Sequence, residues 1–100
     1  MNKKDVLIVC ALRKETQGQL TDWLGGNDWP IIYTGVGKVN ATYELTKYLV
    51  ENGLPQLVVN YGTAGSKNLP IGELVDCTRF VQRDMKITQL GFYEGQTPFE

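Results

Sequence analysis

VLIVCAL, the stretch from Val6 to Leu12, decides the fold class of this chain. It is a continuous apolar run rich in β-branched residues, without the alternation of a strand that faces water on one side. Such a run is typical of a strand in a parallel sheet that is covered on both faces. Because it begins so near the amino terminus, we expect this strand at the centre of the sheet.

Helix and strand patterns alternate after this first strand. From Glu15 apolar side chains recur at helical spacing, and GGND at residues 25–28 is typical of a helix end. The further expected elements are a strand at Ile31–Thr34, a helix at Val39–Glu51, and strands at Leu57–Tyr61 and Glu73–Val81. The second helix is expected to place Ala41, Leu45, Tyr48 and Leu49 on one face and Glu44, Lys47 and Glu51 on another. This alternation predicts an α/β fold with right-handed crossovers and a parallel sheet.

Length, charge and cysteine content narrow the class of protein. One hundred residues, 42% of them hydrophobic, predict a single domain over residues 1–100. A formal net charge of −1 lacks the basic footprint of a nucleic-acid-binding protein. Cys10 and Cys77, without histidine or CxxC spacing, predict neither a zinc site nor a disulfide framework, and we interpret them as reduced thiols of a cytoplasmic protein. No run reaches the roughly 20 apolar residues of a membrane span.

Three loops follow the carboxyl ends of predicted strands. They lie at residues 13–15, 35–38 and 62–66. The carboxyl ends of parallel strands meet at one edge of an open α/β sheet, and ligands bind at that edge. The sequence therefore predicts a small-molecule crevice there, without naming its occupant.

Two of these loops are built from small residues. Gly35-Val36-Gly37 precedes a helix, where backbone N–H groups favour an anion, but neither the dinucleotide-binding nor the Walker pattern is complete. The second loop, Gly62-Thr63-Ala64-Gly65-Ser66, adds two hydroxyl groups. For each loop taken alone, a turn that needs positive φ or tight packing explains the glycines as well as a ligand does.

Two roles are open to the carboxylate of Glu15, which follows the first strand. The simpler role is to stabilise the first turn of a helix, an effect of about 0.3–1 kcal/mol at an exposed position. The functional role is to orient and deprotonate a water, provided that partial burial raises the pKa of the carboxyl group toward the working pH. On the sequence alone the simpler role is favoured.

Five segments, taken together, resemble one known family in order and in spacing. They read VCALRKET, TGVGKVNA, NYGTAGS, LPIGELVD and RDMKITQLGFYEGQTPFE, and they cover nearly all 100 residues. They resemble the purine nucleoside phosphorylase and nucleosidase superfamily, and the most similar branch is that of the bacterial methylthioadenosine/S-adenosylhomocysteine nucleosidases. The resemblance implies a three-layer α/β/α fold with a mixed, largely parallel central sheet, of which this chain resembles the amino-terminal half.

The resemblance also implies a reaction and a set of site residues. The reaction is hydrolysis of the N-glycosidic bond of a purine nucleoside through a transition state like an oxocarbenium ion, for which a well-held water matters most. Glu15 matches the family's water-activating glutamate. The implied substrate contacts are Val36 and Gly37 in the glycine turn, Thr63, Ala64 and Gly65 beneath the sugar and base, and Ile87, Leu90 and Pro98 where a neighbouring subunit closes the 5′ pocket. A homodimer is therefore implied, without nucleic acid, membrane, metal or organic cofactor.

Some residues depart from the pattern of the methylthioadenosine branch. Arg83 stands where that branch usually has histidine, Lys86 replaces an aspartate, Tyr61 a threonine, and Leu90 an aromatic residue. The substrate is therefore expected to differ within the purine nucleosides and nucleotides. We hypothesise that Arg83 contacts a more polar 5′ group, which an unchanged substrate preference in Arg83→Ala would contradict.

Three other interpretations stay open. A phosphate-dependent phosphorylase needs arginines that bind phosphate, and the chain offers Arg13 and Lys14 in the first loop; Glu15 in that loop and Lys38 at the glycine turn favour a hydrolase. In the family the aspartate that protonates the purine lies in a carboxyl half that this sequence lacks. Without that donor, a non-catalytic nucleoside-binding module of the same fold is the second interpretation. An unrelated flavodoxin-like domain with purely structural glycine turns is the third.

Overall fold

The computed structural model describes residues 5–18, 20 and 29–99. It divides the chain into two compact units, residues 1–65 and residues 66–100, and each is described by itself. The prediction of one domain over residues 1–100 stays a prediction. The helix expected between Glu15 and the GGND sequence lies largely outside the described residues.

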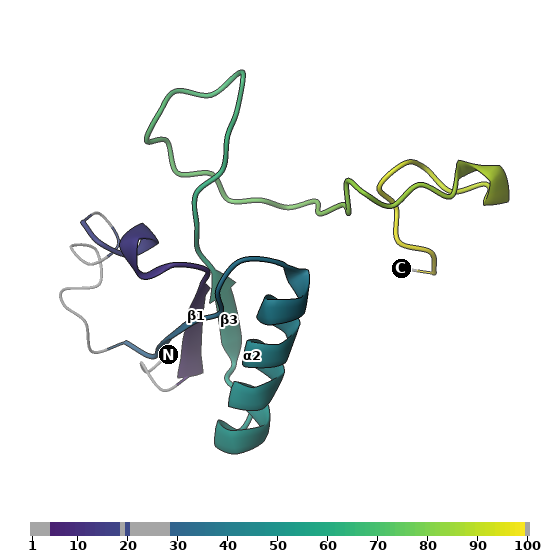
Figure 1. Cartoon of the computed structure of the whole chain (residues 1–100). Coiled ribbons are helices and arrows are strands. Elements are labelled where there is room, and N and C mark those ends of the chain that lie inside the picture. The colour runs from purple at the N-terminus through teal and green to yellow at the C-terminus, as the bar shows by residue number, and fades with distance from the viewer. Residues whose placement is uncertain (1–4, 19, 21–28, 100) are drawn as a thin grey trace. The chain divides into compact units, whose positions relative to one another are not determined.

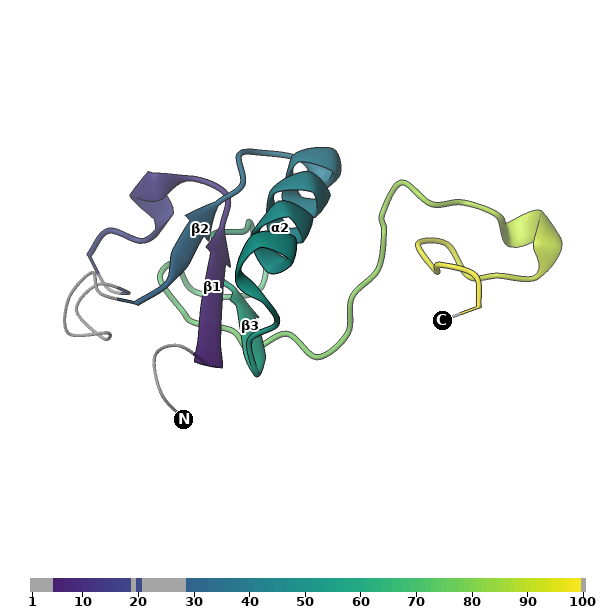
Figure 2. The same ribbon diagram turned by 90° about the horizontal axis from the view of Figure 1, so that it is seen from below.

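The first unit contains a parallel sheet of three strands (Figures 1 and 2). β1 (Val6–Cys10) lies between β2 (Ile31–Tyr33) and β3 (Leu57–Asn60), and it pairs in parallel with both. Ile8 lies opposite Ile31 on one side and opposite Val59 on the other. The expected strands and the central place of the first one are therefore confirmed, each strand ending one or two residues earlier than predicted.

The core of this unit is built on β1. Leu7, Ile8, Val9 and Cys10 are all buried, and the side chains of Leu7 and Cys10 are almost fully enclosed. Leu20 is also buried. Because side chains of consecutive residues point to opposite faces of a sheet, burial of four residues in a row means that both faces of β1 are covered, as its continuous apolar pattern predicted.

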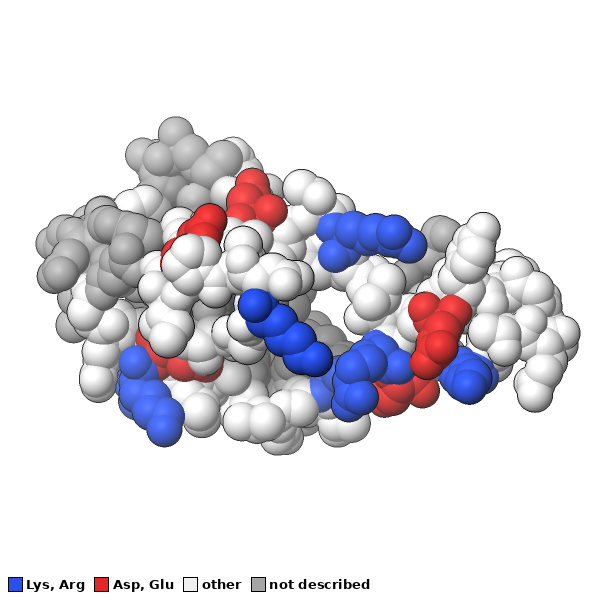
Figure 3. Space-filling view, turned by 90° about the horizontal axis from the view of Figure 1, so that it is seen from above, with Lys and Arg blue, Asp and Glu red and all other residues white. Residues whose placement is uncertain are grey.

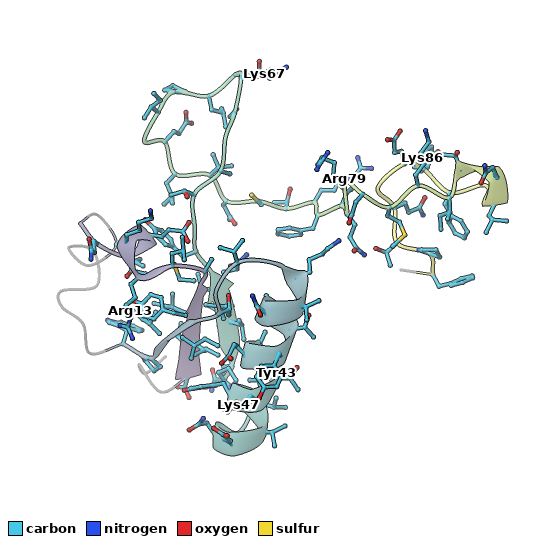
Figure 4. The ribbon with its side chains drawn as sticks, in the orientation of Figure 1. Arg13, Tyr43, Lys47, Lys67, Arg79 and Lys86 are labelled. Carbon is cyan, nitrogen blue, oxygen red and sulfur yellow. The ribbon has the colours of Figure 1, made fainter. Side chains whose placement is uncertain are left out.

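The helix α2 (Lys38–Asn52) accompanies the sheet (Figure 2). It begins after Gly37 and ends before Gly53, and both glycines have positive φ, a conformation that a side chain disfavours. The residues predicted for its apolar face, Ala41, Leu45, Tyr48 and Leu49, are the half-buried ones. Glu44 is half-buried with them, contrary to the prediction, whereas Lys47 is exposed and projects from the helix beside Tyr43 (Figure 4).

Residues 66–99, the described part of the second unit, contain no strand, so the strand predicted at residues 73–81 is wrong. These nine residues are all exposed and extended without a ladder partner. A strand is stable only when its backbone N–H and C=O groups pair with a neighbour, and apolar alternation alone cannot supply one. The prediction was based on the side-chain pattern, which does not show whether a neighbouring strand is available for pairing.

Turns and a short 3₁₀ helix, Thr88–Leu90, organise the rest of the second unit. Gln82 N–H donates to the Gly95 carbonyl at 2.8 Å, and Gly95 N–H donates to the Met85 carbonyl at 2.6 Å. Gly95 is buried and has a φ of 83°, and a Cβ there would approach the Gln82 carbonyl oxygen to 3.2 Å, so both the backbone conformation and the available space favour glycine. Phe92 packs edge-to-face on Phe99.

The distribution of charge and the hydrophobicity of the helices describe the molecule further. Acidic and uncharged side chains lie among the basic ones on the face drawn in Figure 3. Within residues 5–18, 20 and 29–99, no helix is long and apolar enough to cross a membrane.

Candidate active site

The carboxyl ends of the three strands meet at one edge of the sheet. Thr34 N–H donates to the Cys10 carbonyl at 2.9 Å, and Gly35 N–H to the Ala11 carbonyl at 3.0 Å. On the other side of β1, Tyr61 N–H donates to the Val9 carbonyl at 2.9 Å. These bonds extend each ladder one step beyond the strands, and the loops that follow therefore leave the sheet together, as predicted.

The loop after β1 forms a 3₁₀ turn, Arg13–Glu15, that places the Glu15 carboxylate at this edge. Glu15 N–H donates to the Leu12 carbonyl at 3.1 Å, and the Glu15 Oε1 atom accepts from the Leu12 N–H at 3.1 Å. The side chain thus satisfies a backbone donor that a helix start leaves unpaired, which is the simpler role considered for it. This bond turns the carboxylate back over the end of β1.

The loop after β3 holds the other carboxylate oxygen. Glu15 Oε2 accepts from the Thr63 N–H at 2.8 Å and from the Thr63 hydroxyl at 2.8 Å. Gly62 permits this close approach, because a Cβ there would stand only 3.3 Å from Oε2. Glu15 and Thr63, predicted as site residues from the family resemblance, are therefore brought together, and Ala64 and Gly65 follow directly in the chain.

These contacts lower the pKa of Glu15 below its ordinary value of 4.5. The hydroxyl of Thr63 is the largest cause and its N–H the next, because donors stabilise the charged carboxylate. Loss of solvation acts in the opposite direction but is smaller, since the side chain is only partly buried. The condition attached to the functional role, that partial burial raises this pKa, is therefore not met, and the carboxylate is ionised at neutral pH.

Cys10 is the fourth contact of the carboxylate, and the sequence did not mark it as part of a site. Its side chain is fully buried at the end of β1, and Sγ lies 3.3 Å from the Leu12 carbonyl oxygen and 3.7 Å from Glu15 Oε1. Burial, together with the charge of Glu15, raises the pKa of the thiol, which stays protonated at neutral pH. The only signal in the sequence was its place five residues before Glu15.

The glycine turn after β2 is shaped by its backbone. Gly35 and Gly37 have φ values of 76° and 105°, so the structural explanation of both glycines holds. The side chain of Asn40 donates to the Val36 carbonyl at 2.7 Å and closes the turn. Among the described residues no side chain caps the start of α2, and Val36 is 68% exposed. Roles of Val36 and Gly37 in substrate binding stay predictions.

Arg13, one residue weighed as a phosphate ligand, packs against β2. Its guanidinium lies 4.6 Å from the centroid of the Tyr33 ring, a cation–π contact, and Figure 4 shows it beside the strands. The Tyr33 hydroxyl lies 2.8 Å from the hydroxyl of the buried Thr16, which in turn donates to the Arg13 carbonyl. This cluster, which the sequence did not reveal, fixes the turn that carries Glu15.

The remaining predicted residues lie in the second unit. Arg83 is exposed, Leu90 is 73% exposed, and Ile87 and Pro98 are partly buried. Their predicted contacts with a 5′ group stay predictions. Among the described residues, no group of three or more histidine, cysteine, aspartate or glutamate side chains could hold a metal ion.

The fold and the candidate site define the class of the protein. It is an α/β protein in which the loops at the carboxyl edge of a parallel sheet hold a hydrogen-bonded carboxylate. The chain belongs to the phosphorylase superfamily, whose family model matches residues 10–100. The family predicted from the sequence, and with it the α/β fold class of the nucleoside phosphorylases, is therefore confirmed.

Curated proteins named 5′-methylthioadenosine/S-adenosylhomocysteine nucleosidase are similar to the chain. The one from Anoxybacillus flavithermus is 36% identical over 77 residues, 75% of this chain and 33% of the relative. Those from a Geobacillus species and from Pseudoalteromonas translucida are 36% and 34% identical over 80 residues, 78% of this chain and 34% of each relative. The chain thus spans about a third of the length of the relatives it matches. No solved structure matches it.

Proposed function

We propose that this chain is the Glu15-bearing part of an enzyme that hydrolyses the N-glycosidic bond of a purine nucleoside. Membership in the phosphorylase superfamily and the names of the relatives support this proposal. The observation that carries it is the Glu15 carboxylate at the carboxyl edge of the sheet, hydrogen-bonded to the loop after β3. Nucleosides related to methylthioadenosine and S-adenosylhomocysteine are the proposed substrates.

In the proposed reaction, Glu15 orients a water and accepts its proton. The water oxygen bonds to C1′ of the ribose while the bond from C1′ to the purine nitrogen breaks, and the electron pair leaves with the base. A carboxylate with a lowered pKa is a weak base toward free water. The attacking water, however, becomes acidic as it bonds to a cationic sugar, so a weak base held in the correct position is sufficient.

The hydrogen bonds of Glu15 limit where this water can bind. A carboxylate offers about four acceptor positions, and each Glu15 oxygen already faces two donors. A water must therefore replace one of these donors. The longest contact is the Cys10 thiol at 3.7 Å from Oε1, whereas both Thr63 donors lie at 2.8 Å from Oε2. The water is accordingly proposed at Oε1.

Hydrolysis is favoured over phosphorolysis by the position of Arg13. A phosphorylase needs cationic side chains directed at phosphate, and the Arg13 guanidinium lies over the ring of Tyr33. The group that the first loop directs toward the loop after β3 is the carboxylate of Glu15, which repels phosphate.

A nucleoside-binding module without turnover is the second candidate, and one observation favours it. The carboxylate of Glu15 is fully occupied by its own chain, as a purely structural residue would be. In that case Glu15 joins two loops and takes no part in chemistry. Binding of purine nucleosides is then expected without release of the base.

We further propose that Val36, Gly37, Thr63, Ala64 and Gly65 contact the nucleoside and that Arg83 contacts its 5′ group. We also propose that the whole protein is a cytoplasmic homodimer, in which Ile87, Leu90 and Pro98 of a neighbouring subunit close the 5′ pocket. The basis is the match of these positions to the family motifs within residues 10–100. Substrate preference in Arg83→Ala and the mass of the protein in solution test these two parts separately.

The test of the proposed function follows release of free base from the complete gene product. Methylthioadenosine, S-adenosylhomocysteine, inosine and AMP are each supplied with and without phosphate. Base release without phosphate is expected, and Glu15→Gln should slow it by roughly 10²–10⁴-fold, the usual contribution of a general base. The matched control is Glu51→Gln, a change on the exposed side of α2 that should leave the rate unaltered.

Three other outcomes of this assay would change the proposed function. Release that requires phosphate would assign the protein to the phosphorylases. Nucleoside binding by calorimetry without release would assign it to the binding modules. A Glu15→Gln variant as active as the parent would remove Glu15 from the chemistry.

A further inference from the structure

The Cys10 thiol is a buried group that the proposed reaction does not use. It lies at the end of β1 with no exposed surface, and one face of it meets the carboxylate proposed to activate water. Its sulfur has two oxygen neighbours, the Leu12 carbonyl at 3.3 Å and Glu15 Oε1 at 3.7 Å. Both distances are within reach of an S–H donor.

A thiol carries one proton, so it can donate fully to only one of these oxygens at a time. Rotation about the Cβ–Sγ bond redirects that proton without moving the sulfur. The thiol stays neutral, because burial and the adjacent carboxylate both oppose its ionisation. It is therefore a donor throughout the neutral pH range, and a weak one that a water can displace.

We propose that Cys10 is a positioning residue for Glu15, whose thiol donates to Oε1 in the empty site and turns to the Leu12 carbonyl when a water binds at Oε1. The thiol thereby keeps that position occupied by a neutral, replaceable donor. This inference rests on the role proposed for Glu15, because only a carboxylate that binds the attacking water needs one of its acceptor positions to be freed.

Other ionisable groups around Glu15 do not provide this donor. The 3₁₀ turn contributes Arg13, which lies over Tyr33 of β2, and Lys14, which is exposed. The segment at residues 62–65 contributes backbone N–H groups and the Thr63 hydroxyl, and no ionisable side chain. Among the residues that the structure describes, Cys10 is therefore the ionisable group near Oε1 whose substitution should change the pKa of Glu15.

The primary test is an NMR titration of the Glu15 carboxyl carbon in the complete gene product. Cys10→Ala should raise the pKa of Glu15, because one donor to the charged form is removed, whereas Cys10→Ser should keep it near the parent value. The matched control is Cys77→Ala, a change at an exposed cysteine of the second unit, which should have no effect. An unchanged pKa in Cys10→Ala, or equal shifts in Cys10→Ala and Cys10→Ser, would overturn the inference.

A second measurement does not depend on the folding of a Cys10 variant. In a Cys77→Ser background this chain has a single thiol, and its S–H stretching band reports the acceptor strength. Glu15→Gln replaces a carboxylate oxygen by a weaker amide acceptor, so the band should move to higher frequency. A band that stays in place shows that the thiol does not donate to Glu15.

Kinetics separate this inference from the proposed function. If base is released, Cys10→Ala should move the acid limb of the kcat/KM profile to higher pH and lower kcat/KM on that limb by about two- to threefold, the low end of a hydrogen-bond contribution. An unmoved acid limb, with Glu15→Gln inactive, overturns the role of Cys10 alone. An active Glu15→Gln overturns the role of Glu15 in the reaction, while the titration still decides whether the thiol contacts it.

Discussion

β1 and β3 have similar apolar sequences, but β1 is buried and β3 is largely exposed. Both are short, apolar strands rich in β-branched residues, and they pair with each other in parallel. Leu7 in β1 is 1% exposed, whereas Leu57 and Val58 in β3 are 47% and 41% exposed. β1 has a neighbour on each side, and β3 has one neighbour among the described strands. An apolar pattern therefore shows that a strand forms, and its burial depends on which segments lie beside it.

The same contrast continues into the candidate site. From the end of β1 come Cys10 and the Leu12 N–H, which contact one oxygen of Glu15, and from the end of β3 comes Thr63, which contacts the other. Of these residues Cys10 is buried, whereas Leu12 and Thr63 are exposed. One carboxylate thus joins a well-packed strand end to a weakly covered one, and substitutions on the two sides should differ in their effects.

The largest expected effect is on the core side of this comparison. Leu7→Ala leaves a cavity at an almost fully buried position and should lower the free energy of unfolding by about 2–5 kcal/mol. Val58→Ala removes partly exposed carbons from β3 and should cost about 1 kcal/mol or less. Urea denaturation of the 100-residue chain measures both.

Equal losses of unfolding free energy in Leu7→Ala and Val58→Ala would contradict the difference in burial between β1 and β3. They would show that β3 is as well covered as β1, and so that segments outside the described residues, or another molecule, pack on it. The ratio of the two losses is thus a direct measure of how far the two strands differ in burial.

An intermediate effect is expected at the contact between the two strand ends. Gly62→Ala places a Cβ about 3.3 Å from Glu15 Oε2, so the carboxylate must shift by a few tenths of an ångström. Because a misplacement of about 1 Å can cost 100-fold in rate, we expect base release to fall by about tenfold. The control is Glu51→Gln, a change at an exposed position of α2 outside the proposed site. If both variants are equally active, the loop after β3 does not constrain Glu15.

The smallest effect is on the pH dependence of stability. The folded-state pKa of Glu15 is lowered, so its contribution to stability is present above the unfolded pKa and is lost as pH falls through the folded value. The stability difference between the parent and Glu15→Gln should therefore shrink in acid. In a Thr63→Val background, which lacks the hydroxyl, the same difference should depend less on pH. A difference that is constant from neutral pH to well below 4.5 would contradict the lowered pKa.

The strands and α2 were predictable because their signals are local. The apolar run of β1, the strand-helix alternation and the glycines that bound α2 are visible in the sequence. The strand at residues 73–81 was not, because its existence depends on a partner that the local pattern does not reveal. Half-burial of Glu44 was likewise missed, since helical spacing gives the apolar face and not its width.

The candidate site was predictable to the level of its loops and not of its contacts. Parallel strands had to bring Glu15 and Thr63 to one edge, and they do. The direction of the Glu15 pKa shift could not be predicted, because it depends on hydrogen-bond donors whose orientation the sequence does not show. The Cys10 contact and the Arg13–Tyr33 stack were missed for the same reason, because the sequence does not show which side chains the fold brings into contact.

The bonds of Glu15 to Thr63 join residues 48 positions apart. An acid at position 15 therefore closes a long loop of the folded chain whether or not any bond is ever cleaved beside it. A relative without catalytic activity would still gain this link between the two loops from the same acid. A glutamate at this position in a relative is therefore explained by the link between the two loops. Catalytic turnover is shown only by an assay.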